Sequence, residues 1–193
     1  MNYTKFVGLD VHKSTISVAV AYSHLEQTEY LGTIPNTPNA LISLVKRLGN
    51  QNKTKFCYEA GPCGYGIYRQ LTNLGVSCVV VAPSLIPVKP GEHIKTDQRD
   101  AKKLARLLRN GELTPVWVPD SRQEALRDLL RMRLDACRDL LRKRNQLSKF
   151  LLRLGITPPE KTKAWSVKYH TWLNSIRLEE PAHQFILSQH IHS

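Results

Sequence analysis

Hydrophobic and polar residues alternate with period two along the first part of the chain, which predicts β-strands. This alternation predicts three successive strands, at residues 4–11, 14–22 and 28–34. Helical spacing then predicts two helices, at residues 39–48 and 65–74, and apolar runs predict a strand after each, at 54–59 and 76–81. Because the last of these runs is apolar without alternation, we expect it to be a buried parallel strand.

Beyond a loop rich in proline, the helical period returns and continues for most of the chain. One helix is predicted from Asp97 to Arg109, where Asn110 and Gly111 end it. Residues 116–118 read as a short strand, and a long helix follows from Ser121 to about Leu154. Ser121 and Glu124 have the spacing of a capping box, so we expect the long helix to begin there.

Three antiparallel strands followed by alternating helices and strands is the element order of an RNase H-like fold. The predicted class is therefore α/β, with a mixed sheet flanked by helices and a long projecting basic helix after it. We expect three parts: an α/β domain at 1–120, a coiled-coil arm at 121–157, and the start of a linker or helical segment at 158–193.

The long helix combines an apolar stripe with a strongly basic surface. Leu130, Leu134, Cys137 and Leu141 are spaced by four, three and four residues, as in a coiled coil. The segment from Arg122 to Arg153 carries ten Lys and Arg. At 1.5 Å per residue the helix would be about 50 Å long, so we expect it to project from a small domain. Two readings stay open: a coiled-coil arm with a solvated outer face, or a helix that also binds phosphate.

The charge of the chain indicates a polyanionic partner. The formal net charge is +12 and the isoelectric point is about 9.7. Residues 1–88 hold seven basic and four acidic side chains, a balance of +3, which leaves +9 for the other 105 residues. Nucleic acid is the expected partner. A basic protein of a membrane surface is the competing class, but it would need an amphipathic helix with a broad, bulky apolar face.

The four cysteines and the absence of targeting signals favour a reducing cytoplasm. Cys57, Cys63, Cys78 and Cys137 form no C-x-x-C pair, so we expect free thiols rather than a zinc site or disulfides. No apolar run is long enough to serve as a signal peptide or to span a membrane. We therefore expect no membrane association and a cytoplasmic protein.

Four carboxylates stand where such a fold would place a metal site: Asp10, Glu59, Asp97 and Asp100. Asp10 interrupts a predicted strand, Glu59 ends another, and the three-residue spacing of the last two puts them on one helix face. Carboxylate oxygens suit Mg²⁺, and two such ions would hold the reacting oxygens of a phosphoryl transfer. Each acid also has an ordinary explanation, since Asp97 suits a helix cap, Asp100 a first helical turn, Glu59 a solvated strand end and Asp10 a turn.

Three sequence blocks resemble the DEDD transposases of the IS110 family of insertion sequences, which are similar to the Piv-type DNA invertases. The blocks are Gly8-Leu9-Asp10-Val11-His12-Lys13, Tyr58-Glu59-Ala60-Gly61, and Lys95-Thr96-Asp97-Gln98-Arg99-Asp100-Ala101. The resemblance implies a RuvC-like domain whose four acids bind Mg²⁺ or Mn²⁺. It also implies site-specific recombination of DNA, a guide (bridge) RNA and assembly into homo-oligomers, here through the long helix.

Basic side chains near these blocks and along the long helix are the expected contacts to nucleic acid. They are Lys13, Lys95, Arg99, Arg142, Lys143, Arg144, Lys149 and Arg153. Members of the family continue into a second domain that supplies a nucleophilic serine, and nothing in residues 155–193 resembles it. Ser166, Ser175 and Ser188 match no such motif, so we assign no nucleophile and expect this chain alone to be incomplete. Two alternatives are a catalytically silent binding or oligomerisation fragment and a stand-alone RuvC-type junction nuclease.

Overall fold

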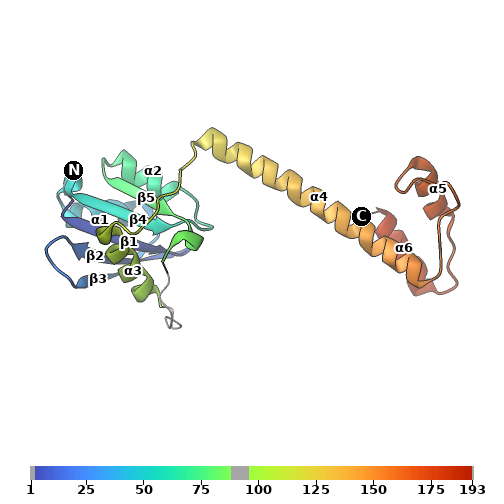
Figure 1. Cartoon of the computed structure of the whole chain (residues 1–193), viewed down its shortest axis with the longest axis horizontal. Coiled ribbons are helices and arrows are strands. Elements are labelled where there is room, and N and C mark those ends of the chain that lie inside the picture. The colour runs from blue at the N-terminus through green and yellow to red at the C-terminus, as the bar shows by residue number, and fades with distance from the viewer. Residues whose placement is uncertain (1–2, 88–95, 193) are drawn as a thin grey trace. The chain divides into compact units, whose positions relative to one another are not determined.

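The computed structural model describes residues 3–87 and 96–192 (Figure 1). The chain divides into two compact units, Met1–Val118 and Pro119–Ser193. The first unit is a mixed α/β fold, consistent with the RNase H-like order predicted from the sequence. Its strands are β1 (Lys5–Val11), β2 (Thr15–Tyr22), β3 (Thr28–Pro35), β4 (Thr54–Glu59) and β5 (Ser77–Val81). Its helices are α1 (Pro38–Leu48), α2 (Gly66–Asn73) and α3 (Asp97–Asn110), with short 3₁₀ turns at Gln51–Lys53 and Pro83–Leu85.

The five strands form one sheet in the order β3-β2-β1-β4-β5. The first three are antiparallel neighbours, whereas β4 lies parallel to β1 and β5 parallel to β4. Parallel strands need a crossover connection, and α1 and α2 supply the two crossovers. The central strand β1 therefore has a hydrogen-bonded neighbour on each side.

The two faces of the sheet are covered by different helices. Because side chains alternate along a strand, Val7 and Leu9 of β1 point to one face, where α1 and α2 complete the largest apolar core. Phe6, Gly8 and Asp10 point to the other face, on which α3 lies. Asp10 thus belongs to the α3 face of the sheet.

Gly8 lets α3 lie directly against the central strand. A Cβ atom at this position would collide with the backbone carbonyl of Ala101 and would lie 2.5 Å from the Ala105 amide nitrogen. Small residues continue the contact on β2, where Ala19 and Ala21 pack against the same two alanines of α3. The register of helix against strand is therefore fixed within one turn of Asp97.

The prediction of a short strand at residues 116–118 is wrong. The segment makes one isolated antiparallel bridge, between Val81 and Pro115, and the Val116 amide donates to the Val80 carbonyl. Proline has no amide hydrogen, so Pro115 and Pro119 both lack the donor that a continuous ladder would need.

The second unit begins with α4 (Ser121–Arg153), a single helix of 33 residues. Its cap lies one residue earlier than predicted: Asp120 accepts from the Gln123 amide, and the Gln123 side chain accepts from the Asp120 amide. Asp120 and Gln123 have the same spacing as Ser121 and Glu124, and aspartate caps a helix as well as serine does.

Two short helices, α5 (Val167–Ser175) and α6 (Pro181–His192), pack on the last turns of α4. Leu147, Phe150 and Leu151 of α4 form a small core with them. The preceding part of α4 has no such cover, and its large apolar side chains are about half exposed or more. These side chains are Leu126, Leu129, Leu130, Met132, Leu134, Leu140 and Leu141. Within the described residues, no helix is both long and apolar enough to cross a membrane.

Candidate metal centre

Asp10 and Glu59 lie at the same end of two parallel strands. Leu9 of β1 is paired with Tyr58 of β4, so the next residue on each strand, Asp10 and Glu59, occupies the same row. Cys57 of β4 faces α3, since its thiol donates to the Leu104 carbonyl, and Glu59 shares its side of the strand. The two carboxylates are thus placed on one face of the sheet, at the carboxyl end of adjacent strands.

Helix α3 brings the other two acids to this face. Thr96 is its N-cap and accepts a hydrogen bond from the Arg99 amide, so Asp97 is the first helical residue rather than the cap. Ala101 of α3 packs against Gly8 of β1. Asp97 lies one helical turn before Ala101, and Asp10 lies two residues after Gly8. The close approach at Gly8 therefore carries the start of α3 to the end of β1.

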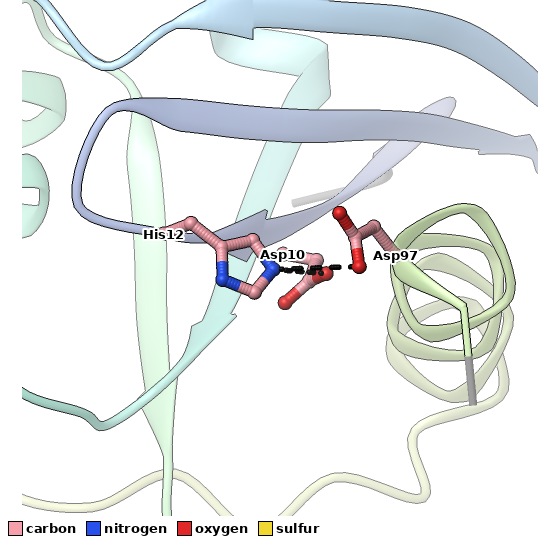
Figure 2. A group of neighbouring side chains, drawn as sticks. All are labelled: Asp10, His12 and Asp97. Atoms are coloured by element: carbon pink, nitrogen blue, oxygen red, sulfur yellow. Dashed lines mark hydrogen bonds and ion pairs between the residues drawn. The ribbon is translucent and has the colours of Figure 1, made fainter.

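Three side chains converge there (Figure 2). The Nε2 atom of His12 lies 3.2 Å from Oδ2 of Asp10 and 3.5 Å from Oδ1 of Asp97. One ligand atom from each of these residues lies within 4.8 Å of the other two. The side chain of Asp10 is 21% exposed, whereas His12 and Asp97 are 51% and 62% exposed. The group is open to solvent on one side and anchored in the sheet on the other.

Burial raises the pKa of the Asp10 carboxyl above its usual range. His12 opposes this shift through its charge and its hydrogen bond, while the negative charges of Asp97 and Asp100 add to it. A carboxylate that has lost part of its hydration and faces two further acids is stabilised by a cation. A bound cation would therefore stabilise the ionised form of the Asp10 carboxyl.

The structure brings together some of the four predicted acids and not others. Asp10 and Asp97 meet directly, and Asp100 is close enough to influence the pKa of Asp10. Glu59 is exposed at the end of β4 and is not part of the converging group. His12 is the residue that the sequence reasoning passed over. Its signal was the two-residue spacing from Asp10, which puts both side chains on one side of an extended chain.

These residues fit a divalent cation. The two carboxylates suit Mg²⁺ or Mn²⁺, and the imidazole adds a nitrogen donor of the kind that divalent transition metals accept. The partly buried Asp10 supplies the charge that such an ion neutralises. Asp10, Asp97 and His12 would be its nearest ligands, with Asp100 and Glu59 on the same face.

Comparison with known proteins shows the family. Residues 7–156 match the family model DEDD_Tnp_IS110, described as a transposase. The chain belongs to the DEDD transposase family of IS110 elements.

Two curated relatives agree. A putative transposase, y4qE, of Sinorhizobium fredii is 44% identical over 186 residues, which is 95% of this chain and 47% of the relative. The transposase for insertion sequence element IS1533 of Leptospira borgpetersenii is 41% identical over 173 residues, 89% of this chain and 50% of the relative. The chain thus spans about half the length of the relatives it matches.

In this chain of the DEDD transposase family, several of the predicted nucleic-acid contacts already have partners within the chain. Arg142 pairs with Asp139 at 2.8 Å, Arg144 lies 4.9 Å from the centre of the Trp165 ring, and Arg153 lies 5.7 Å from that of Phe150. Cation–π contacts of this kind hold a guanidinium in place while leaving its charge available. Lys143 and Lys149 are exposed on α4.

The remaining predicted contacts belong to the first unit. Lys13 follows His12 in the turn after β1, and Arg99 lies in the first turn of α3, so both are near the acidic group in the chain. Lys95 lies outside the described residues. Lys13 and Arg99 are thus the predicted contacts of the first unit that adjoin the acidic residues in the sequence.

Three serines of the second unit, Ser166, Ser175 and Ser188, form hydrogen bonds within their own helices. Ser166 caps α5 by accepting from the Tyr169 amide, and the hydroxyl of Ser175 donates to the Trp172 carbonyl. Ser188 donates in the same way to the Phe185 carbonyl in α6. Local bonds of this kind are common for serine at and within helices.

Proposed function

We propose that this chain supplies the divalent-metal site with which an insertion-sequence transposase cuts and rejoins DNA. The observation that carries the proposal is the convergence of Asp10 and Asp97, two acids 87 positions apart in the sequence, in a chain of the IS110 transposase family. Asp10, Glu59, Asp97 and Asp100 are the proposed catalytic and metal-binding set, with Mg²⁺ or Mn²⁺ as the cofactor.

The chemistry of the site follows from its charges. A bound divalent ion would neutralise charge that develops on phosphate oxygens during phosphoryl transfer. Asp10, held on the rigid central strand, and Asp97, at the start of α3, would fix the position of the reacting phosphodiester. The half-exposed His12 and the exposed Asp97 leave one side open to a strand of nucleic acid.

The partners of the chain are also proposals. The net charge of +12, concentrated after residue 88, supports binding to DNA and to a guide RNA. The uncovered apolar stripe of α4 supports homo-oligomers formed through a coiled-coil arm. We propose the parts 1–120, 121–157 and 158–193 as the catalytic domain, this arm and a linking segment. Bacterial or archaeal cytoplasm, close to the nucleoid, is the compartment that such partners require.

Thermal unfolding with and without metal tests the site. If Mg²⁺ or Mn²⁺ binds only the folded chain, metal at one hundred times its dissociation constant should stabilise the fold by about 2.7 kcal/mol. Asp10→Asn and Asp97→Asn should both abolish that gain, because each removes a ligand charge. Asp128→Asn, on the exposed surface of α4, is the matched control and should keep it.

A gain that is equal in the wild type and in both site variants would overturn the metal site. Nicking of duplex DNA by the purified chain then separates the remaining readings. Robust metal-dependent cleavage supports a stand-alone nuclease, and the complete absence of cleavage despite metal binding supports a silent binding fragment. Cleavage that appears only when the other half of a relative is added supports a transposase half.

A further inference from the structure

His12 brings a nitrogen atom to a site that the four predicted acids would make from oxygen alone. It follows Asp10 by two residues at the end of β1, so the two side chains leave the chain on the same side (Figure 2). The Nε2 atom of the imidazole faces one carboxylate oxygen of Asp10 and one of Asp97. Its side chain is 51% exposed, so packing alone does not hold it there.

The distances from Nε2 to the two carboxylates would also suit ligands that share one ion. In an octahedral site with ligands about 2.1 Å from the ion, neighbouring ligand atoms are about 3 Å apart. Nε2 lies 3.2 Å from an Asp10 oxygen and 3.5 Å from an Asp97 oxygen, within a few tenths of an ångström of that value. Small movements of exposed side chains would close the difference.

We propose that His12 Nε2 is a direct ligand of the divalent ion and makes this site prefer Mn²⁺ to Mg²⁺. The inference rests on the metal site proposed above and adds to it a nitrogen ligand and a metal preference. Mg²⁺ favours hard oxygen ligands, whereas divalent transition metals also accept nitrogen ligands, with an affinity that is lowest for Mn²⁺ and increases toward Cu²⁺. A site with Asp10, Asp97 and His12 should therefore favour Mn²⁺ over Mg²⁺ more than an all-carboxylate site would.

A simple hydrogen bond or ion pair is the competing explanation of the same contacts. In that case the imidazole interacts with Asp10 and Asp97 only while no metal is present, and it leaves when a cation arrives. The two explanations differ in what the ion touches. A direct ligand leaves a nitrogen bonded to the metal, and an ion pair leaves only oxygen.

Pulsed electron paramagnetic resonance of bound Mn²⁺ distinguishes the two, because a coordinated ¹⁴N nucleus couples to the electron spin. The full chain is loaded with one equivalent of Mn²⁺, once with natural histidine and once with ¹⁵N-histidine. We expect a nitrogen coupling that changes with the isotope, is lost in His12→Gln and persists in His24→Gln. His24 is an exposed histidine of the same unit and serves as the matched control.

Calorimetric titration of the same variants measures the preference. His12→Gln should weaken Mn²⁺ binding by at least about tenfold and should change Mg²⁺ binding little. Removing a residue that only hydrogen-bonds to a metal ligand already lowers metal affinity by about tenfold or more. Far-ultraviolet circular dichroism confirms that the variant is folded.

Two results would overturn the inference. If Mn²⁺ binds and Asp10→Asn prevents it, but no histidine coupling is seen, the metal site stands and His12 is not a ligand. If Mn²⁺ does not bind, or binds equally to Asp10→Asn, the proposed metal site fails together with the inference.

Discussion

Asp10 is the residue on which the site depends, and the pKa of its carboxyl is raised. Neighbouring acids raise a pKa by repulsion. The largest cause, however, is burial beside α3, and repulsion from Asp97 and Asp100 contributes less. Burial is a property of the folded sheet, so no spacing of acids along the chain could have revealed it.

The raised pKa predicts how stability changes with pH when no metal is bound. The folded chain holds the Asp10 proton more tightly than the unfolded chain, whose carboxyl has a pKa near 3.8. That stabilisation is fully present below the unfolded pKa and is lost as the pH rises through the folded pKa. We therefore expect metal-free Asp10→Asn to be more stable than the wild type at pH 7.

Urea unfolding at pH 7 and at pH 3 measures the effect. The advantage of Asp10→Asn should shrink at pH 3, where the wild-type carboxyl is protonated. Glu26→Gln, at an exposed position of the same unit, controls for loss of one negative charge. If Asp10→Asn is the less stable chain at pH 7, its ionised carboxyl stabilises the fold and the burial argument is wrong.

At the scale of elements, α3 positions Asp97 and Asp100, and Gly8 allows this helix to lie directly against β1. Gly8→Ala places a methyl group against the backbone of α3, which cannot move as a side chain can. Overpacking of a core costs about 1–3 kcal/mol, and we expect a loss at the upper end of that range. Because α3 carries Asp97, the stabilisation by metal should also fall.

Thermal unfolding with and without Mn²⁺ measures both losses. Gly66→Ala, at the start of α2 where a Cβ would meet nothing within 4 Å, is the matched control. It should be neutral or slightly stabilising, since alanine favours a helix over glycine. A Gly8→Ala chain that keeps its stability and its metal response would show that α3 does not depend on this contact.

The apolar stripe of α4 makes a second prediction at this scale. If it pairs with another copy of the helix, burying each leucine contributes about 1.5–3 kcal/mol. Leu134→Gln with Leu141→Gln should then yield monomers at concentrations where the wild type is associated, as measured by sedimentation. Arg138→Gln with Asp139→Asn changes the same number of residues outside the stripe and should leave the association intact. A monomeric wild type at about 100 µM would contradict the coiled-coil arm.

Local patterns predicted most elements of this chain well, and contacts between distant segments account for the rest. Strands β1 to β5 and helices α1 to α4 follow periodicity and turn residues, which the sequence displays directly. The prediction of a strand at 116–118 was wrong because prolines flank this segment. Whether a proline interrupts a strand depends on which backbone amides must donate hydrogen bonds, and the sequence does not show this. His12 was missed because its contact with Asp97 joins residues 85 positions apart in the sequence. Glu59 was grouped with the other acids by motif, and the pairing of β1 with β4 puts it in the row next to Asp10, outside the group of Asp10, His12 and Asp97.

At the scale of the whole molecule, the positive charge is partly balanced within α4 itself. Asp128, Asp135 and Asp139 each pair with an arginine three residues later on the helix. Exposed pairs of this kind contribute little to stability. They do, however, compete with phosphate for Arg131, Arg138 and Arg142, so a count of basic residues overestimates the charge available to nucleic acid.

The salt dependence of DNA binding measures that available charge. If Arg142, Lys143 and Arg144 contact phosphate, replacing all three with alanine should lower the slope of log affinity against log salt by up to about three units on duplex DNA. Replacing Lys46 and Arg47, at the end of α1, removes two charges elsewhere and should change the slope less. An unchanged slope in the triple variant would leave α4 as an oligomerisation helix alone.

The position of β1 in the middle of the sheet has a consequence for motion. A central strand is released only when the sheet opens as a whole, whereas edge strands such as β3 and β5 can fray separately. We therefore expect Asp10 to lie in the part of the first unit that opens most slowly. Asp97 is the first residue of α3, and the ends of helices open more readily than their middles. Motions that separate the Asp10 and Asp97 carboxylates should therefore be motions of the first turn of α3, while β1 stays in place.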